Sequence, residues 1–417
     1  MKISLNAQIL LGAALGIVAG LGMAAAGKDA AVTQNGLYVA GLAGGVFVDL
    51  LKMILVPLVF TSIAAGVANL RMHRQMHRVW TLTLGFFVLS MAIAIVLGMS
   101  AANLFAPGKG LSLDLFRDAM QGFQAKRMGL AEFAVSFFHG LFVNPFAALA
   151  QGNVLAIVVF ALFVGVALVM GGERYRNVLA LLQEGLELTL LIVGWVMRLA
   201  PFGIMALLAK LAATQNVLLL ASLGKFVAVV LGTTLLHGAV VLPLILFAVT
   251  GVGPLKFWRG AREALITAFA TSSSSATIPV TLRCMQQHLH VSPGIAGFVV
   301  PLGATVNMDG TALYEAAAAL FIANLAGIDL DLAQQLIVFF VAMLAAIGAP
   351  GIPSAGMVTM VMVLQSVGLP AEAIAILLPI DRLLDTVRTA VNVEGDMVGS
   401  LVVQRLVNGP RSALENI

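Results

Sequence analysis

The sequence predicts an all-α membrane protein with about eight transmembrane helices and two re-entrant helical hairpins, arranged as inverted repeats. Of the 417 residues, 60% are hydrophobic and 10% are charged, whereas soluble domains are about 45–50% apolar and about 25% charged. Unbroken apolar runs such as 154–170 favour helices, because apolar and polar residues alternate in a membrane barrel. Because so few residues are charged, the surface cannot face water on all sides, and soluble enzymes, nucleic-acid-binding proteins and disordered proteins are excluded.

Six apolar stretches precede the hairpins. They fall at 5–26, 37–70, 79–105, 135–171, 177–212 and 215–250. A spanning helix needs about 20 apolar residues, so the 37–70 stretch must tilt or kink, and Pro57 can supply a kink. The 5–26 run is predicted to be the first membrane helix rather than a cleaved signal peptide, because it is longer than the apolar part of such a signal.

Charged linkers between the spans predict the orientation. The linkers at 71–78, 173–176 and 256–262 are basic, whereas 327–331 carries two aspartates and no basic residue. Because cytoplasmic loops are enriched in Lys and Arg, we expect both termini to lie in the cytoplasm and the protein to lie in the inner (plasma) membrane. The basic residues lie mostly in short clusters between apolar runs, so the net charge of +4 does not imply a nucleic-acid partner and none is expected. The single cysteine, Cys284, excludes an internal disulfide framework.

Two later segments, 256–290 and 335–368, each run apolar, then small and polar, then apolar. Their polar centres are 271–275, a threonine followed by four serines, and 350–356, which is rich in Pro and Gly. Each arm has about 14 residues and is too short to span the bilayer. Irregular backbone at membrane depth is tolerated where protein buries it or where it borders a wet cavity. Two such segments, each followed by a full span, indicate a transporter.

The last span, 370–408, carries a polar stripe on one face. At about 100° per residue, five residues fall within about 60° of Asp385: Asp381, Arg388, Thr389, Asn392 and Asp396. Each charge at the bilayer centre costs about 2.5–3.5 kcal/mol on insertion scales. Arg388 can bind a carboxylate and Asp385 an ammonium group, which together suit a zwitterion. The alternative is a self-neutralising Asp–Arg pair that holds helices together.

The preceding span contains Asn307-Met308-Asp309-Gly310-Thr311, a pattern that predicts an unwound turn. Asn307 and Asp309, together with Asn392 and Asp396, offer hard oxygen ligands for a small cation such as sodium. One turn further on, Glu315 lies on an apolar face, which favours a neutral carboxyl group. Glu315 is therefore either a proton carrier or the donor of one structural hydrogen bond. His237, in the apolar 215–250 span, is interpreted as a structural core residue.

Four segments resemble the dicarboxylate/amino acid:cation symporter family: 272–279, 307–315, 351–356 and 381–396. The resemblance implies a homotrimer with an elevator mechanism, in which residues 1–250 form mainly the scaffold and 251–417 the transport core. The core would comprise the hairpin 256–290, the helix 291–324, the hairpin 335–368 and the helix 370–408. The spans 79–105 and 215–250 would move with it.

The resemblance also implies roles for single residues. Arg388 would hold the side-chain carboxylate of the substrate, and Asp385 its amino group. The pocket would be completed by Thr311, Thr389, Asn392, Ser274 and the backbone at Ile352 and Gly356. The cation ligands would be Asn307, Asp309, Asn392, Asp396 and the Gly303 carbonyl, with Ser90 as a further hydroxyl. Beyond the coupling ions, no cofactor is implied.

The same resemblance predicts the substrate class. Neutral amino acid transporters of the family replace the arginine at Arg388, and four-carbon dicarboxylate transporters lack the pair at Asp385 and Thr389. This chain keeps all three residues, which favours glutamate or aspartate. The alternative within the family is a four-carbon dicarboxylate symporter, and the alternative from another class is an ion channel. No enzyme motif is found.

Coupling is predicted from departures from the family pattern. Sodium-driven relatives carry hydroxyls on the third span in a Tyr-x2-Thr-Ser pattern, and the matching residues here are Phe87, Ser90 and Met91. Glu315 matches the glutamate of proton-coupled members. A pocket-side arginine of relatives is replaced by Ser272 or Thr386. We expect proton-driven uptake, while the retained aspartates leave sodium open as a second coupling ion.

Overall fold

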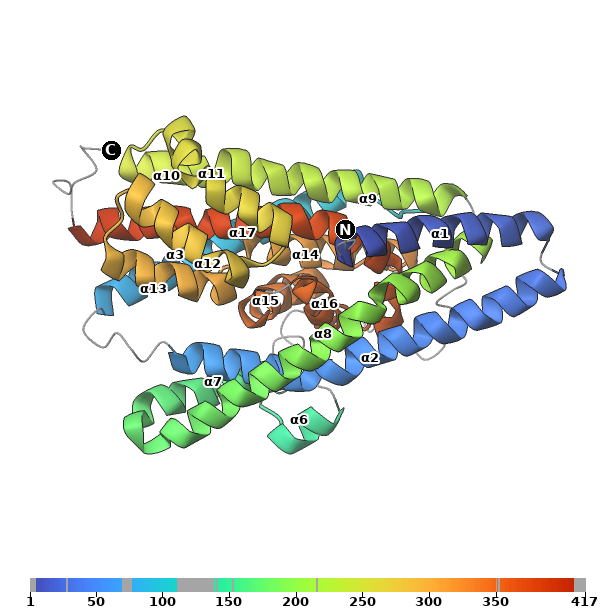
Figure 1. The fold of residues 1–417 in the computed structure, drawn as a ribbon, viewed down its shortest axis with the longest axis horizontal. Coiled ribbons are helices and arrows are strands. Elements are labelled where there is room, and N and C mark those ends of the chain that lie inside the picture. Colours follow the sequence, from blue (N-terminus) through green and yellow to red (C-terminus); the bar gives the residue numbers. More distant parts are fainter. Residues whose placement is uncertain are drawn as a thin grey trace.

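The computed structural model describes residues 5–27, 29–69, 77–110, 139, 142–151, 154–214, 217–349, 351 and 353–408. Within these ranges every regular element is helical, which confirms the all-α prediction. Figure 1 shows that the long helices run lengthwise through the molecule, several of them obliquely.

One group of long helices comes from the first half of the chain. It contains α1 (Leu5–Ala26), α2 (Ala31–Asn69), α6 (Pro145–Gln151), α7 (Val154–Gly171), the 3-10 turn η3 (Gly172–Tyr175) and α8 (Arg176–Thr214). Helix α8 packs along both α1 and α2, and α2 also packs along α7. The predicted kink residue Pro57 lies inside α2.

In the stretch predicted as a span at 135–171, the described residues show a break before α6, which begins at Pro145, and α7 occupies the rest of the stretch. Residues 142–144 are not helical. The side chain of Asn144 accepts a hydrogen bond from the Phe146 N–H (2.9 Å), and Pro145 occupies the first helical position. Both features favour a helix start at this point.

Small residues bring α1 against α8. A Cβ added to Gly12, Gly16 or Gly20 would lie 2.3–2.5 Å from a backbone carbonyl oxygen of α8. The three glycines recur every fourth residue and so lie on one face of the helix. Their missing side chains allow the close backbone approach that is common between membrane helices.

A second group surrounds α17 (Ile374–Asn408), which follows the 3-10 turn η6 (Ala371–Ala373). The group also contains α3 (His77–Phe105), α9 (Val217–Leu236), the π-helical turn η4 (His237–Val241) and α10 (Leu242–Thr250). Helix α17 contacts α3, α9 and α10 and lies among them in Figure 1. These contacts agree with the expectation that 79–105 and 215–250 accompany the core, a division that stays a prediction.

The predicted broken segments are helix pairs. The first consists of α11 (Pro254–Thr271), α12 (Ser274–Arg283) and the π-helical turn η5 (Cys284–His288), and the second of α15 (Leu332–Gly348) and α16 (Ala355–Ser366). Ser272 and Ser354, next to the breaks, have φ values of +52° and +59°. Between the pairs, α13 (Pro293–Val306) and α14 (Asp309–Leu325) are separated at Asn307–Met308, as the unwound turn predicted.

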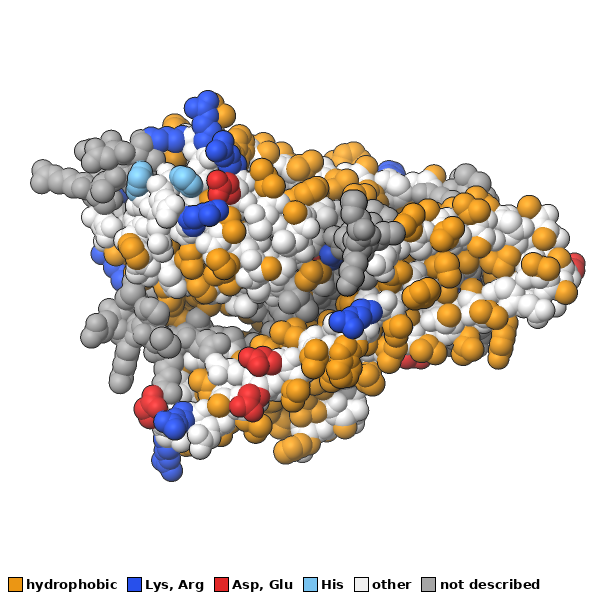
Figure 2. Space-filling model, viewed as in Figure 1, with side chains coloured by type: hydrophobic (Ala, Val, Ile, Leu, Met, Phe, Trp, Pro, Cys, Tyr) orange, Lys and Arg blue, Asp and Glu red, His pale blue; other side chains and the backbone are white. Residues whose placement is uncertain are grey.

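Apolar surface covers much of the molecule. Figure 2 shows hydrophobic side chains over most of the visible face, with Lys, Arg and His gathered toward one end. The α7–α8 turn and the α10–α11 junction, both basic, lie at this end, and the α1–α2 turn lies at the other. This distribution agrees with the predicted topology.

Within the described residues, three helical stretches are long and apolar enough to cross a membrane. They are Arg78–Phe105, Val159–Lys210 and Ala221–Thr250, and the second, at 52 residues, contains most of both α7 and α8. The arms α15 and α16 belong to a class of shorter apolar helices. The total of about eight spans stays a prediction.

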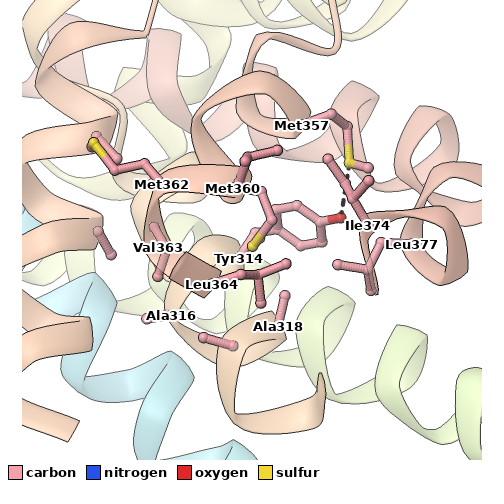
Figure 3. Packing of buried hydrophobic residues seen from close by; sticks show 14 of the residues in the cluster. Tyr314, Ala316, Ala318, Met357, Met360, Met362, Val363, Leu364, Ile374 and Leu377 are labelled. Carbon is pink, nitrogen blue, oxygen red and sulfur yellow. Dashed lines mark hydrogen bonds between the residues drawn. The ribbon is translucent and has the colours of Figure 1, made fainter. Parts of the chain in front are cut away.

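The core beside the polar residues is built on α14, in which sixteen of the seventeen residues are buried. A helix with no exposed face must be enclosed by its neighbours, and α3, α9, α15, α16 and α17 all contact α14. Figure 3 shows the Tyr314 ring of α14 among methionine and aliphatic side chains from the segments that follow it. Its hydroxyl donates a hydrogen bond to the Met357 sulfur at 3.3 Å.

Candidate functional site

The two polar tips touch each other. The hydroxyl of Ser273 donates a hydrogen bond to the carbonyl oxygen of Gly351 (2.6 Å), and the Ser275 N–H donates to the same oxygen (3.1 Å). Gly351 also approaches α13, since a Cβ on it would lie 2.5 Å from the Ala304 carbonyl oxygen. The contact between Ser273 and Gly351, which are 78 positions apart, therefore places both tips at the end of α13.

Arg388 is buried at the centre of an ionic cluster on α17. Its Nη2 donates to Oδ1 of Asp381 (2.8 Å) and to Oδ1 of Asp385 (2.9 Å). The guanidinium lies over the Tyr314 ring, 4.0 Å from its centroid, which adds a cation–π contact. The Asp–Arg pair expected as the structural alternative therefore exists, and it holds Arg388 in place.

Two donors of Arg388 stay available to a ligand. Among the described residues, Nε and Nη1 have no hydrogen-bond partner although they are buried. A Cβ on Gly356 would lie 3.7 Å from both terminal nitrogens and 3.1 Å from the Thr311 methyl group. The guanidinium therefore lies close to the backbone at Gly356. A buried donor without an acceptor is costly, so this is where a carboxylate would bind most favourably.

Asp385 connects the cluster to the second tip. Its Oδ2 accepts hydrogen bonds from the Ser354 N–H (2.9 Å) and from Nη1 of Arg382 (3.3 Å). The carboxylate thus lies between Arg388 and the start of α16, and its predicted role as the ligand of a substrate ammonium group stays a prediction. Ile352, predicted to offer its backbone nearby, lies outside the described residues.

The remaining predicted pocket residues are buried in the same region. Asn392 donates to the Thr311 hydroxyl (3.2 Å) and accepts from the Gly310 N–H (2.8 Å), so it fixes the start of α14 against α17. Thr389 is 5% exposed and Ser274 4% exposed. Ser274 begins α12, next to the contact between the tips.

Among the predicted cation ligands, Asn392 and Asp396 lie about one and two turns beyond Arg388 on α17, while Asn307 and Asp309 lie at the break between α13 and α14. Asn307 donates from Nδ2 to Oδ1 of Asp396 (3.1 Å). A Cβ on Gly303 would come within 2.1 Å of the same Asp396 oxygen, so the α13 backbone is close to that carboxylate. Asp309 is fully buried, and its Oδ2 contacts the hydroxyl of Ser90 on α3.

Two side-chain oxygens of this group have no donor. Oδ1 of Asn307 and Oδ1 of Asp309 are buried and have no hydrogen-bond partner among the described residues. Across the same residues, no three His, Cys, Asp or Glu side chains are placed to hold a metal ion. A cation here would therefore take carboxylate, amide and carbonyl oxygens, which suits sodium better than a transition metal.

Glu315 lies on α14, one turn beyond Thr311, and is fully buried. Its Oε1 accepts a hydrogen bond from the Thr359 hydroxyl of α16, and its Oε2 has no partner among the described residues. The carboxyl group thus joins the second helix pair to α14. Glu315 accepts the hydrogen bond in this contact rather than donating it, and both roles predicted for Glu315 stay predictions.

Several contacts were not predicted from the sequence. His237, interpreted as structural, has its Nε2 2.9 Å from Oδ2 of Asp309. Tyr314 contacts Arg388, and Thr359 contacts Glu315. Glu394, on the opposite face of α17 from the polar stripe, accepts a hydrogen bond from the Trp258 indole N–H (2.9 Å). The sequence marks His237 as a lone polar residue in an apolar helix. Its partner, Asp309, is 72 positions away and is identified only in the folded structure.

The close approach of α13 to α17 makes Gly303→Ala a test of the cation group. The added methyl group would collide with Asp396 Oδ1 and lie 3.0 Å from the Phe87 ring. We expect a loss of stability of about 1–3 kcal/mol and a higher sodium concentration for half-maximal uptake. Thermal unfolding and sodium titration measure both. Gly297→Ala, on the same helix with open space around its Cβ, is the control and should change neither.

Comparison with known proteins places the chain in a family. The sequence model of the Sodium:dicarboxylate symporter family matches residues 5–406. The chain belongs to this family. It is therefore a membrane transporter rather than an enzyme, and the resemblance inferred from the four motifs is confirmed.

Relatives within the Sodium:dicarboxylate symporter family carry different substrate names. The bovine Neutral amino acid transporter B(0) is 35% identical over 93% of this chain and 77% of its own length. An Excitatory amino acid transporter of Caenorhabditis elegans is 33% identical over 89% of this chain and 82% of its own. The bovine Neutral amino acid transporter A is 30% identical over 94% of this chain and 81% of its own length. Because relatives named for neutral and for excitatory amino acids have similar identities to this chain, overall identity does not predict its substrate. The substrate class must be inferred from single residues of the site.

Proposed function

We propose that this member of the Sodium:dicarboxylate symporter family is a secondary active symporter that imports glutamate or aspartate. The observation that carries the proposal is Arg388, which is buried with two unpartnered donors beside the carboxylate of Asp385. An acidic amino acid offers one carboxylate for Arg388 and an ammonium group for Asp385. Its second carboxylate would meet the backbone and hydroxyl groups at the tip near Ser274.

The two alternative substrate classes lack one of the charged groups that the site is proposed to bind. A neutral amino acid has no second carboxylate for the free Nε and Nη1 donors of Arg388, and buried donors left without an acceptor are costly. A four-carbon dicarboxylate lacks the ammonium group proposed to bind Asp385. Selectivity between analogues is largest where a missing group leaves a buried polar atom unpaired.

Coupling is proposed to use sodium, protons or both. The free oxygens of Asn307 and Asp309, together with Asp396, support a sodium site. Glu315 supports proton transport, because its carboxyl group lies between α14 and α16 with one oxygen unpartnered. Both groups lie near the Arg388 cluster: Asp396 is about two turns from Arg388 on α17, and Glu315 follows Tyr314, whose ring contacts the guanidinium. Substrate and ions would therefore bind next to each other.

The proposed cycle is an elevator movement of the core (251–417, with α3, α9 and α10) against a scaffold of α1, α2, α7 and α8 in a homotrimer of the inner membrane. The support is the contact pattern, in which α8 packs extensively on both α1 and α2, while α17 packs mainly on the core. Both termini are proposed to be cytoplasmic, in line with the basic linkers.

The test is uptake of labelled aspartate by the purified protein in liposomes. Unlabelled aspartate or glutamate should compete, whereas serine, glutamine and succinate should compete at least about tenfold less well. Uptake should saturate with concentration, which separates a transporter from an ion channel. Preferential competition by serine or succinate would overturn the proposed substrate.

A further inference from the structure

His237 connects the π-helical turn η4 to the candidate cation group. The side chain is fully buried, and its Nε2 lies 2.9 Å from Oδ2 of Asp309, 72 positions away in the sequence. An ionised carboxylate can only accept hydrogen bonds, so Nε2 carries the hydrogen.

The two oxygens of Asp309 have different surroundings. Oδ2 is contacted by two groups, the His237 imidazole and the Ser90 hydroxyl. Oδ1 has no partner among the described residues, and neither does Oδ1 of Asn307. Asn307 is close by, because a Cβ on Gly395 would lie 2.7 Å from its Nδ2 and 3.2 Å from Asp309 Oδ2. The donors on Oδ2 thus fix the carboxylate and leave Oδ1 for a ligand.

The π-helical turn accounts for how His237 is held. A π-turn inserts one residue into a helix and is frequent at functional sites. His237 is its first residue, and the next, Gly238, lies against α17: a Cβ there would be 2.9 Å from Val391 and 3.0 Å from Glu394 Oε2. The turn is therefore in contact with α17 on one side and with α14, through His237, on the other.

We propose that His237 is a positioning residue of the cation site, holding Asp309 so that its free oxygen coordinates the coupled sodium ion. This inference rests on the proposed function, in which sodium is a coupling ion. Partners that orient a ligand change metal affinity by about 10–100-fold when they are removed. The role matters in this chain because Phe87 and Met91 leave Ser90 as the sole hydroxyl of the three matched positions.

The test compares variants of His237 by sodium titration of aspartate uptake in liposomes. His237→Leu removes the donor and should raise the sodium concentration for half-maximal uptake about 10–100-fold, with a smaller change in the rate at saturating sodium. His237→Gln keeps an N–H donor and should show a smaller rise. Thr234→Val is the matched control, because Thr234 is buried near the end of α9, three positions before His237, and its hydroxyl has no partner among the described residues.

The outcomes separate this inference from the proposed function. Sodium-dependent uptake with the same half-maximal concentration in His237→Leu and the unchanged protein would overturn the role of His237 alone. Uptake by the unchanged protein that ignores sodium would overturn the sodium coupling, and this inference with it. If His237→Leu does not fold, His237→Asn decides: sodium should raise the melting temperature of the purified variant less than that of the unchanged protein, and an equal rise contradicts the proposal.

Discussion

Replacing Arg388 with cysteine is expected to lower the affinity for aspartate and glutamate by about 10²–10³-fold and to shift preference toward neutral amino acids. Arg388 is buried, and Nε and Nη1 have no partner among the described residues. Losing one partner of a buried, hydrogen-bonded charge pair costs about 2–5 kcal/mol, and each 1.4 kcal/mol is about tenfold in affinity. Competition of labelled substrate by acidic and neutral amino acids measures the change.

The same substitution leaves Asp381 and Asp385 without their shared cation, so folding must be checked independently. Saturable uptake of a neutral amino acid by Arg388→Cys would show that the variant is folded. Arg283→Cys is the matched control, because Arg283 is exposed and pairs with Glu263 on the first helix pair, away from Arg388. Its substrate preference should not change. Acidic selectivity retained in Arg388→Cys would contradict the pocket assignment.

Replacing Glu315 with glutamine is expected to abolish the dependence of uptake on an imposed proton gradient. The amide is nearly the same size as the carboxyl group, and its oxygen can still accept the hydrogen bond from Thr359. The variant should therefore fold, but its side chain cannot gain or lose a proton. Uptake measured across external pH should become flat in the variant and should vary in the unchanged protein.

Glu394→Gln is the control for Glu315→Gln, since Glu394 is also a buried carboxyl group of the core and keeps its acceptor for the Trp258 indole after the change. Its pH profile should match that of the unchanged protein. An unchanged pH profile in Glu315→Gln would refute the proton-carrier role. If uptake becomes independent of pH in Glu394→Gln but not in Glu315→Gln, Glu394 and not Glu315 carries the proton.

Local sequence patterns predicted much of the fold. The apolar run at 5–26 coincides with α1, and the unwound turn at Asn307–Met308 follows from polar residues that compete with helical hydrogen bonds. The polar stripe on the last span correctly placed Arg388 and Asp385 together. These features depend on neighbours within about a turn of helix, which sequence periodicity describes well.

Contacts between distant segments were not predicted, because periodicity gives the face of a helix and not its partner. The glycines of α1 contact α8 nearly 190 positions later, and this pairing depends on backbone approach rather than on a residue pattern. His237 is a similar case, since its role follows from Asp309 on another helix. The helix start at Pro145 was missed because the continuous apolar run at 135–171 hid the cap at Asn144.

Accumulation of labelled aspartate in liposomes under an imposed ion gradient tests the central claim most directly. Three conditions suffice: an inward sodium gradient at equal pH, an inward proton gradient without sodium, and neither gradient. We predict accumulation above the external concentration under at least one gradient, with no accumulation when both are absent. Aspartate that only equilibrates under every condition, or that is not taken up at all, would contradict the proposed symport.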